Sequence, residues 1–222
     1  MKIAISGASG KTGFRIAEEA LLSGYSTKLL IRKNSVIPKS IESCPKETIS
    51  LCNKAEINNA LKGVDALIIA TGARPSIDLT GPAKVDALGV KNQVECCKDA
   101  GIKRIILVSS LCAGKLIHPL NLFGLILVWK RIGEEFIEKS GLDWTIIRPG
   151  GLNENESQLD KQKILYTESK QQEEGSIPRR LVARACIESI REKNSIGKII
   201  EITSGSDYPK TNMKNAIKSF NI

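Results

Sequence analysis

Three glycines at regular spacing lie close to the amino end, in the segment Ser6-Gly7-Ala8-Ser9-Gly10-Lys11-Thr12-Gly13. Gly7 can adopt the tight turn after a strand, Gly10 leaves room for a phosphate beside the backbone, and Gly13 allows a helix to pack closely on the sheet. A helix that begins here directs unpaired N–H groups and the positive end of its dipole toward phosphate oxygens. The segment therefore predicts a loop, residues 7–13, that binds the two phosphates of a dinucleotide.

The tripeptide Gly10-Lys11-Thr12 also matches the end of a nucleotide-hydrolysing P-loop. That motif requires a glycine five positions earlier, where this chain has Ile5, and an acidic residue at the end of the strand near Ala70. Because both are missing, nucleotide hydrolysis is disfavoured.

The residues at the end of the second expected strand indicate which dinucleotide binds. An acidic residue there would accept hydrogen bonds from the ribose hydroxyl of NAD(H), but this chain has Arg32-Lys33. A guanidinium suits the additional phosphate of NADP(H). The sequence predicts NADP(H) in preference to NAD(H), with Arg32 as a solvated loop charge left as the alternative.

Short apolar runs alternate with helix-length amphipathic segments, which is typical of repeated βαβ units. We expect one domain over residues 1–222, an α/β fold of the Rossmann type, with a doubly wound, mostly parallel sheet and helices on both faces. Residues 1–150 would form the cofactor-binding core, and residues 151–222 a substrate-side cap with the last sheet elements. The expected strands are Lys2–Ser6, Thr27–Ile31, Glu47–Leu51, Ala66–Ala70, Arg104–Ser109, Asp143–Ile147, Ile164–Thr167 and Lys198–Thr203. The expected helices are Lys11–Ser23, Glu56–Leu61, Gly81–Ala100, Asn121–Ser140 and Arg179–Glu192.

Composition narrows the possible partners. The net charge is +9, but Lys and Arg are scattered and aromatic residues make up 4% of the chain, so nucleic-acid binding is disfavoured. The six cysteines form no C-x-x-C pair and there is one histidine, so we expect no metal site and reduced thiols, with Cys96-Cys97 used for packing. The longest apolar run, residues 122–129, is too short to span a bilayer. We expect a cytoplasmic location, and leave peripheral membrane association and the oligomeric state open.

Several segments together resemble the atypical short-chain dehydrogenase/reductases, in the NAD(P)H-binding, NmrA-like group. They are the glycine turn, Arg32, Ala70-Thr71-Gly72-Ala73, Val108-Ser109-Ser110 and Thr145-Ile146-Ile147-Arg148-Pro149-Gly150-Gly151. The stretch from Leu111 to Trp129-Lys130-Arg131 and Glu134-Glu135 is most similar to the NADP(H)-binding domain of the dehydrogenase-like subunit of the chloroplast protein translocon and its cyanobacterial relatives.

This resemblance implies roles for several residues. Thr71, Gly72 and Ala73 would line the cofactor, Ser109 or Ser110 would face the nicotinamide, and Lys130 would reach the nicotinamide ribose. Pro149, Gly150 and Gly151 would close over the carboxamide. Arg74 follows on the cofactor side and would contact a phosphate or the substrate, with an exposed loop charge as the equal alternative.

Two positions depart from the family pattern. Members usually carry Gly-Asp after the third strand, where this chain has Cys52-Asn53, so Asn53 is expected to contact the adenine through its carbonyl oxygen. The typical enzymes place a tyrosine four residues before the lysine, where this chain has Ile126. Because isoleucine transfers no proton, simple alcohol–ketone chemistry is disfavoured.

Two functions remain open. In the first, a reductase passes hydride to a conjugated small-molecule acceptor of the flavin, quinone or pyrrole type, with Ser109, Ser110 and Lys130 around the acceptor. His118 could supply the missing proton, although a lone loop histidine is more often a surface or capping residue. In the second, the chain is a non-catalytic NADP(H) sensor or scaffold that binds a protein partner.

Overall fold

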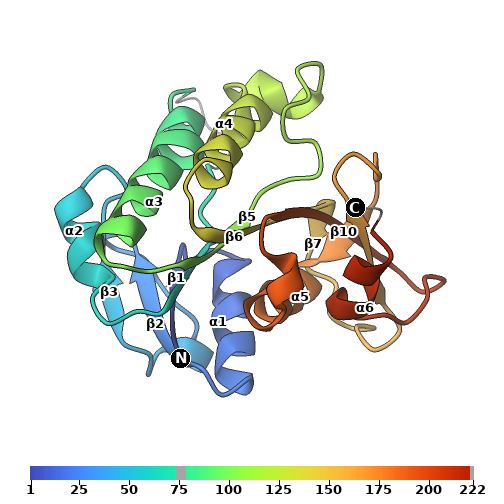
Figure 1. Ribbon diagram of the computed structural model, residues 1–222, viewed down its shortest axis with the longest axis horizontal. Helices are drawn as coiled ribbons and strands as arrows, with labels where there is room; N and C mark the ends of the chain where they lie inside the picture. Colours follow the sequence, from blue (N-terminus) through green and yellow to red (C-terminus); the bar gives the residue numbers. More distant parts are fainter. Residues whose placement is uncertain (74–78, 221–222) are drawn as a thin grey trace.

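The computed structural model describes residues 1–73 and 79–220, without the side chains of Leu120 and Phe123. Its centre is an eight-stranded sheet in the order β3-β2-β1-β4-β5-β6-β10-β8 (Figure 1). All neighbouring strands pair in parallel except β8, which runs antiparallel to β10. The strands are β1 (Lys2–Ser6), β2 (Ser26–Ile31), β3 (Lys46–Thr48), β4 (Ala66–Ile69), β5 (Arg104–Val108), β6 (Asp143–Pro149), β8 (Lys163–Glu168) and β10 (Lys198–Gly205). The fold is thus the expected Rossmann-type α/β sandwich.

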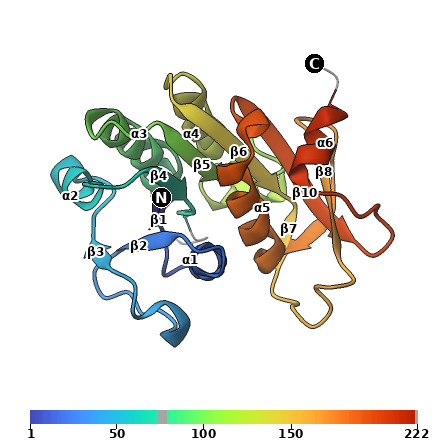
Figure 2. The ribbon, with the colours of Figure 1, turned by 60° about the horizontal axis from the view of Figure 1, so that its bottom comes forward.

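Helices cover both faces of this sheet (Figure 2). One face carries α2 (Lys54–Ala60), α3 (Gly89–Asp99) and α4 (Ile126–Glu138), and the other carries α1 (Gly13–Leu22), α5 (Arg179–Arg191) and α6 (Met213–Lys218). On β1, Ile3 and Ile5 belong to the core beneath α1 and α5, whereas Ala4 belongs to the core beneath α2 and α3. This alternation follows from the two-residue period of a strand, and it explains why consecutive residues in the middle of β1, β4 and β5 are all apolar.

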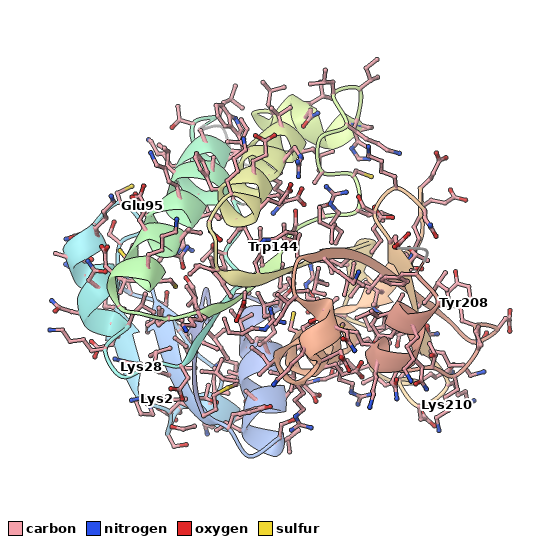
Figure 3. The ribbon with its side chains drawn as sticks, viewed as in Figure 1. Lys2, Lys28, Glu95, Trp144, Tyr208 and Lys210 are labelled. Atoms are coloured by element: carbon pink, nitrogen blue, oxygen red, sulfur yellow. The ribbon has the colours of Figure 1, made fainter. Side chains whose placement is uncertain are left out.

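Ion pairs join elements on the α2–α4 face. The Glu95 side chain on α3 faces α2 at the outer surface (Figure 3), where it pairs with Lys54. Deeper in the molecule, Glu134 of α4 is fully buried and accepts two hydrogen bonds from Arg148 of β6, at 2.9 and 2.7 Å. Arg148 also lies 3.6 Å from the buried Glu201 of β10. Because each buried charge has a partner of opposite sign, this row of residues fixes α4 against β6 and β10.

Several expected elements have different bounds. The third strand ends at Thr48, not at residue 51, so Ile49 and Leu51 lie in the connection after it. The expected helix 81–100 consists of a π-helical segment, η2 (Ala83–Leu88), followed directly by α3. The expected helix 121–140 is also divided, because left-handed backbone at Gly124 and Leu125 separates the 3-10 turn η3 (Pro119–Phe123) from α4.

The segment after Gly150 contributes to two sheets. β10 and β8 extend the main sheet beyond β6, and β7 (Gly151–Asn153) pairs with β9 (Ser176–Pro178) in a small second sheet. The sequence did not predict β7, β9, α6 or the 3-10 turns η1 (Lys39–Ile41) and η4 (Lys193–Ser195). α5 packs beside α1 in one apolar core, so this segment covers a sheet face as well as the carboxyl ends of the strands.

Candidate functional site

Two adjoining cavities follow the carboxyl ends of the central strands. The β2-side cavity, of about 330 Å³, is lined by the ends of β1, β2 and β4 and by residues after β3. The β6-side cavity, of about 400 Å³, is lined by the ends of β4, β5 and β6. Both include Gly10, Ala70, Thr71, Gly72 and Ala73, so the two form one elongated groove. A groove at the point where the strand order reverses is where open α/β sheets bind ligands.

Residues 7–13 form the predicted phosphate loop at the middle of this groove. Gly7 has a φ of +82°, and a Cβ there would lie 2.9 Å from the carbonyl oxygen of Ala70, so only glycine fits. A Cβ on Gly13 would lie 2.1 Å from the carbonyl oxygen of Gly7. Gly13 therefore permits the loop itself to fold back on α1, rather than the contact between α1 and the sheet that the sequence suggested. Within the described residues, the N–H groups of Lys11, Thr12 and Gly13 donate to no protein acceptor, which leaves them available to phosphate oxygens.

Charged side chains brace this loop from outside the groove. Arg15, which is largely buried, donates a 2.7 Å hydrogen bond to the carbonyl oxygen of Lys11 and pairs with Glu156. Burial raises the pKa of Glu156, but the hydrogen bond from Arg15 and the charge of Arg180 outweigh it and lower that pKa. Glu154 pairs with the Lys11 ammonium, so this lysine has a counter-charge next to the groove.

Three buried hydroxyl groups along the groove have no hydrogen-bond partner among the described residues. They are Ser6 Oγ in the β2-side cavity, Thr71 Oγ1 in both cavities and Ser109 Oγ in the β6-side cavity. A buried hydroxyl without a partner costs about 1–3 kcal/mol, so proteins usually satisfy such groups. Together with the N–H groups of the loop, these hydroxyls give the groove wall a set of polar groups that fits the phosphates, riboses and amide of a dinucleotide.

Arg32 and Lys33, which were predicted to bind the extra phosphate of NADP(H), differ in their position relative to the groove. Arg32 lines the β2-side cavity and makes no ion pair with any described residue. Its neighbour in space is a turn in which Ser35 Oγ lies 3.2 Å from Ser9 Oγ of the phosphate loop. Lys33 is exposed and does not line either cavity. Arg32 is therefore positioned to contact a ligand, and Lys33 is not.

Asn53 has a different role in this structure from the predicted one. Its Oδ1 caps α2 by accepting hydrogen bonds from the N–H groups of Ala55 and Glu56, at 3.1 and 3.3 Å. The residue lies outside the lining of the β2-side cavity, where Ile49 and Leu51 provide an apolar wall instead. An Asx cap occupies the same carbonyl oxygen that would have met an adenine amino group.

The β6-side cavity holds most of the predicted reacting groups. Ser109, Ser110, Lys130, Pro149 and Gly150 line it, whereas Gly151 lies just outside, in β7. Leu152 and Arg179, from the segment after Gly150, also line it and were not predicted. Arg74 lies outside the described residues.

Lys130 does not act alone in this cavity. Its Nζ lies 2.8 Å from Oδ1 of Asp86, a buried carboxylate in η2, and Oδ2 of Asp86 accepts a 3.1 Å hydrogen bond from the Ala73 N–H. Asp86 was not predicted to be a site residue, because the sequence around it resembles that of any partly buried helix turn. The charge of Lys130 is thus balanced within the site.

Neither the usual tyrosine position nor His118 places a proton donor in the lining of the β6-side cavity. Ile126, at the usual tyrosine position, is buried at the start of α4 and does not line the cavity. His118 lies in the loop before η3, outside the lining of both cavities. The remaining proton donors at the β6-side cavity are hydroxyls and ammonium or guanidinium groups, which can orient and stabilise an acceptor.

Cys96 and Cys97 lie in the core and do not line the groove. Burial raises the pKa of Cys97 and of Cys186 to about 12, and Cys96 is equally buried in the α3 core. Among the described residues, no cluster of three or more His, Cys, Asp or Glu side chains could hold a metal ion. No helix in the described part of the chain is both long and apolar enough to cross a bilayer.

Comparisons with known proteins agree with this geometry. A family model described as NAD(P)H-binding matches residues 7–193. The chain is 35% identical to an uncharacterised chloroplastic protein of Arabidopsis thaliana, over 98% of this chain and 82% of that protein. It is 34% identical to Protein TIC 62 of Pisum sativum, over 67% of this chain and 32% of that protein, which confirms the resemblance to the translocon subunit. It is 28% identical to sanguinarine reductase of Eschscholzia californica, over 92% of this chain and 89% of that protein.

A solved structure shows the same fold over its whole length. It comes from Bacillus halodurans, is provisionally described as an NAD-dependent epimerase/dehydratase, and superimposes with a TM-score of 0.85 at 26% identity. The superposition covers 98% of this chain and 99% of the other. The family model covers most of the chain, and the glycine loop and the groove agree with it: the chain belongs to the NAD(P)H-binding family.

Proposed function

We propose that this protein is an NADP(H)-dependent reductase that passes hydride to a conjugated acceptor without a tyrosine acid. The observation that carries the proposal is the pairing, in one cavity, of a buried hydroxyl without a partner, Ser109, and an ammonium, Lys130. Bound NADPH would supply the hydride. The name of the relative sanguinarine reductase supports a reduction.

The chain's own groups account for the other requirements. A hydroxyl donor and a fixed positive charge stabilise the negative charge that develops on an acceptor when it receives hydride. In a conjugated acceptor this charge is delocalised, so water can deliver the proton later and the lack of a donor at Ile126 is tolerated. Val108, Pro149 and Leu152 supply apolar lining that favours a flat ring system.

The preference for NADP(H) rests on Arg32. Its guanidinium lines the β2-side cavity without a carboxylate partner among the described residues, and no acidic residue follows β2. A free guanidinium favours a phosphate ester over a ribose hydroxyl because it can donate two charge-assisted hydrogen bonds.

The test combines binding with turnover. Calorimetry should show that the purified protein binds NADPH more tightly than NADH. NADPH absorbance should then fall steadily with at least one member of a panel of flavins, quinones and redox dyes, and Ser109→Ala should slow that reaction by about tenfold or more. Tight NADPH binding without turnover on any acceptor would contradict the reductase. It would favour the second candidate, a non-catalytic NADP(H)-dependent regulator, which the lack of a proton-donating side chain at Ile126 supports.

A further inference from the structure

A buried carboxylate lies beneath the groove without lining it. The Asp86 side chain is 3% exposed and belongs to η2, the π-helical segment between the end of β4 and α3. π-helical turns are rare and often accompany functional sites, because they displace one residue from the regular helical path. Here the displaced turn brings an acidic side chain toward the middle of the sheet's carboxyl edge.

Each oxygen of this carboxylate is used by a different part of the groove wall. Oδ1 pairs with Lys130 Nζ of α4 at 2.8 Å, and Oδ2 accepts from the Ala73 N–H after β4 at 3.1 Å. Gly72, which precedes Ala73, lies beside this ion pair: a Cβ on Gly72 would lie 3.7 Å from Lys130 Nζ and 3.8 Å from Asp86 Oδ1. One carboxylate thus fixes an ammonium and a stretch of backbone that both line the β6-side cavity.

The packing of the two helices leaves little freedom in this arrangement. A Cβ on Gly133 of α4 would lie 2.0 Å from the carbonyl oxygen of Asp86, so the two backbones are in direct contact there. The turn that carries Asp86 therefore cannot withdraw from α4 without breaking a close-packed interface. The distance between Asp86 and Lys130 is set by the fold and not by the ion pair alone.

We propose that Asp86 is a positioning residue that prepares the β6-side cavity for the nicotinamide half of the dinucleotide. It holds the Lys130 side chain in one rotamer and the Ala73 backbone in one conformation before the ligand binds. Asp86 itself does not contact the ligand. The inference rests on the proposed function, since it assumes that a dinucleotide occupies the groove.

The two halves of the groove make the proposal testable by binding alone. The ligand 2′,5′-ADP carries the adenosine-side groups and extends only to the β2-side cavity and the phosphate loop, whereas NADP⁺ reaches both cavities. Asp86→Asn removes the negative charge but keeps the size of the side chain. It should weaken NADP⁺ binding by about ten- to a hundredfold, because the ligand must now order Lys130, and leave 2′,5′-ADP binding unchanged within about twofold.

A double-mutant cycle identifies Lys130 as the intermediary. In a Lys130→Ala background, Asp86→Asn should cause no further loss of NADP⁺ affinity, because the ammonium that Asp86 positions is gone and the introduced amide oxygen still accepts from the Ala73 N–H. Glu188→Gln is a matched control: Glu188 accepts hydrogen bonds from the Tyr166 hydroxyl and the Met213 N–H on the opposite face of the sheet, and its loss should alter neither ligand's affinity.

Equal weakening of NADP⁺ and 2′,5′-ADP by Asp86→Asn would overturn the proposal, as would additive losses in the cycle or no loss at all. If Asp86→Asn does not fold, Asp86→Glu replaces it, because it keeps the charge but moves the carboxylate by one methylene: unchanged NADP⁺ affinity in that variant overturns the proposal, and a loss for NADP⁺ that spares 2′,5′-ADP supports it. If the unsubstituted protein binds neither ligand, the proposed function has failed, and the two failures are thereby told apart.

Discussion

If Arg32 selects NADP(H) as proposed, its replacement by alanine should give a protein that hardly distinguishes NADP(H) from NAD(H). The side chain lines the β2-side cavity and has no counter-charge among the described residues, so its hydrogen bonds are free for a ligand phosphate. A charge-assisted hydrogen bond contributes about 1.5 to 3 kcal/mol, and Arg32 is exposed to solvent, which favours the lower end. We therefore expect NADP⁺ affinity to fall by about tenfold to thirtyfold and NAD⁺ affinity to change by less than about twofold.

Titration calorimetry with NADP⁺ and NAD⁺ at several salt concentrations is the assay. The affinity of the unsubstituted protein for NADP⁺ should fall with ionic strength more steeply than that of Arg32→Ala, because the substitution removes one charge–phosphate contact that salt screens. Lys33→Ala is the matched control: it removes the same charge from the next residue, which does not line the cavity. Equal losses in the two variants would show that only the general positive potential matters, and an unchanged NADP⁺ affinity in Arg32→Ala would refute the assignment.

Three further outcomes are expected. Gly13→Ala should lower the melting temperature by several degrees or prevent folding, because its Cβ would lie 2.1 Å from the Gly7 carbonyl oxygen; a melting curve and binding assay with no change would contradict the loop geometry. Glu156→Gln should cost about 1 kcal/mol of unfolding free energy at neutral pH, where the carboxylate is ionised. Since the folded pKa of Glu156 is lowered, this difference should disappear as pH falls below about 4.5, and a difference that persists in acid would exclude an ionic origin. A thiol reagent should label Cys52 and Cys112 in the native protein well before the four buried cysteines, as mass spectrometry of partly labelled protein can verify.

Local patterns were sufficient to predict the first half of the site. The phosphate loop is a contiguous segment in which a Cβ on Gly10 or Gly13 would meet Gly7, a neighbour in sequence, and Arg32 directly follows the end of β2. The resemblance to the short-chain dehydrogenase/reductases implied that Ser109 and Lys130 lie near the nicotinamide, and both line the β6-side cavity.

What the sequence did not reveal depends on contacts between distant segments. Asp86 becomes part of the site only because a π-helical turn and the close approach at Gly133 bring it to Lys130, and neither leaves a periodic signal. The cap that Asn53 provides was not predicted, because the same amide oxygen suits either an adenine or a helix cap. β7 and β9, of three residues each, are too short for any alternation to show.

The late position of β10 in the chain has a consequence for synthesis. Residues 198–202 of β10 pair with β6 along its outer edge, so that edge stays open until this later part of the chain has left the ribosome. An apolar strand with free N–H and C=O groups invites pairing with another nascent chain. Truncation of the chain soon after Gly150 would make this exposure permanent, and we expect the truncated protein to aggregate even though it contains the entire glycine loop.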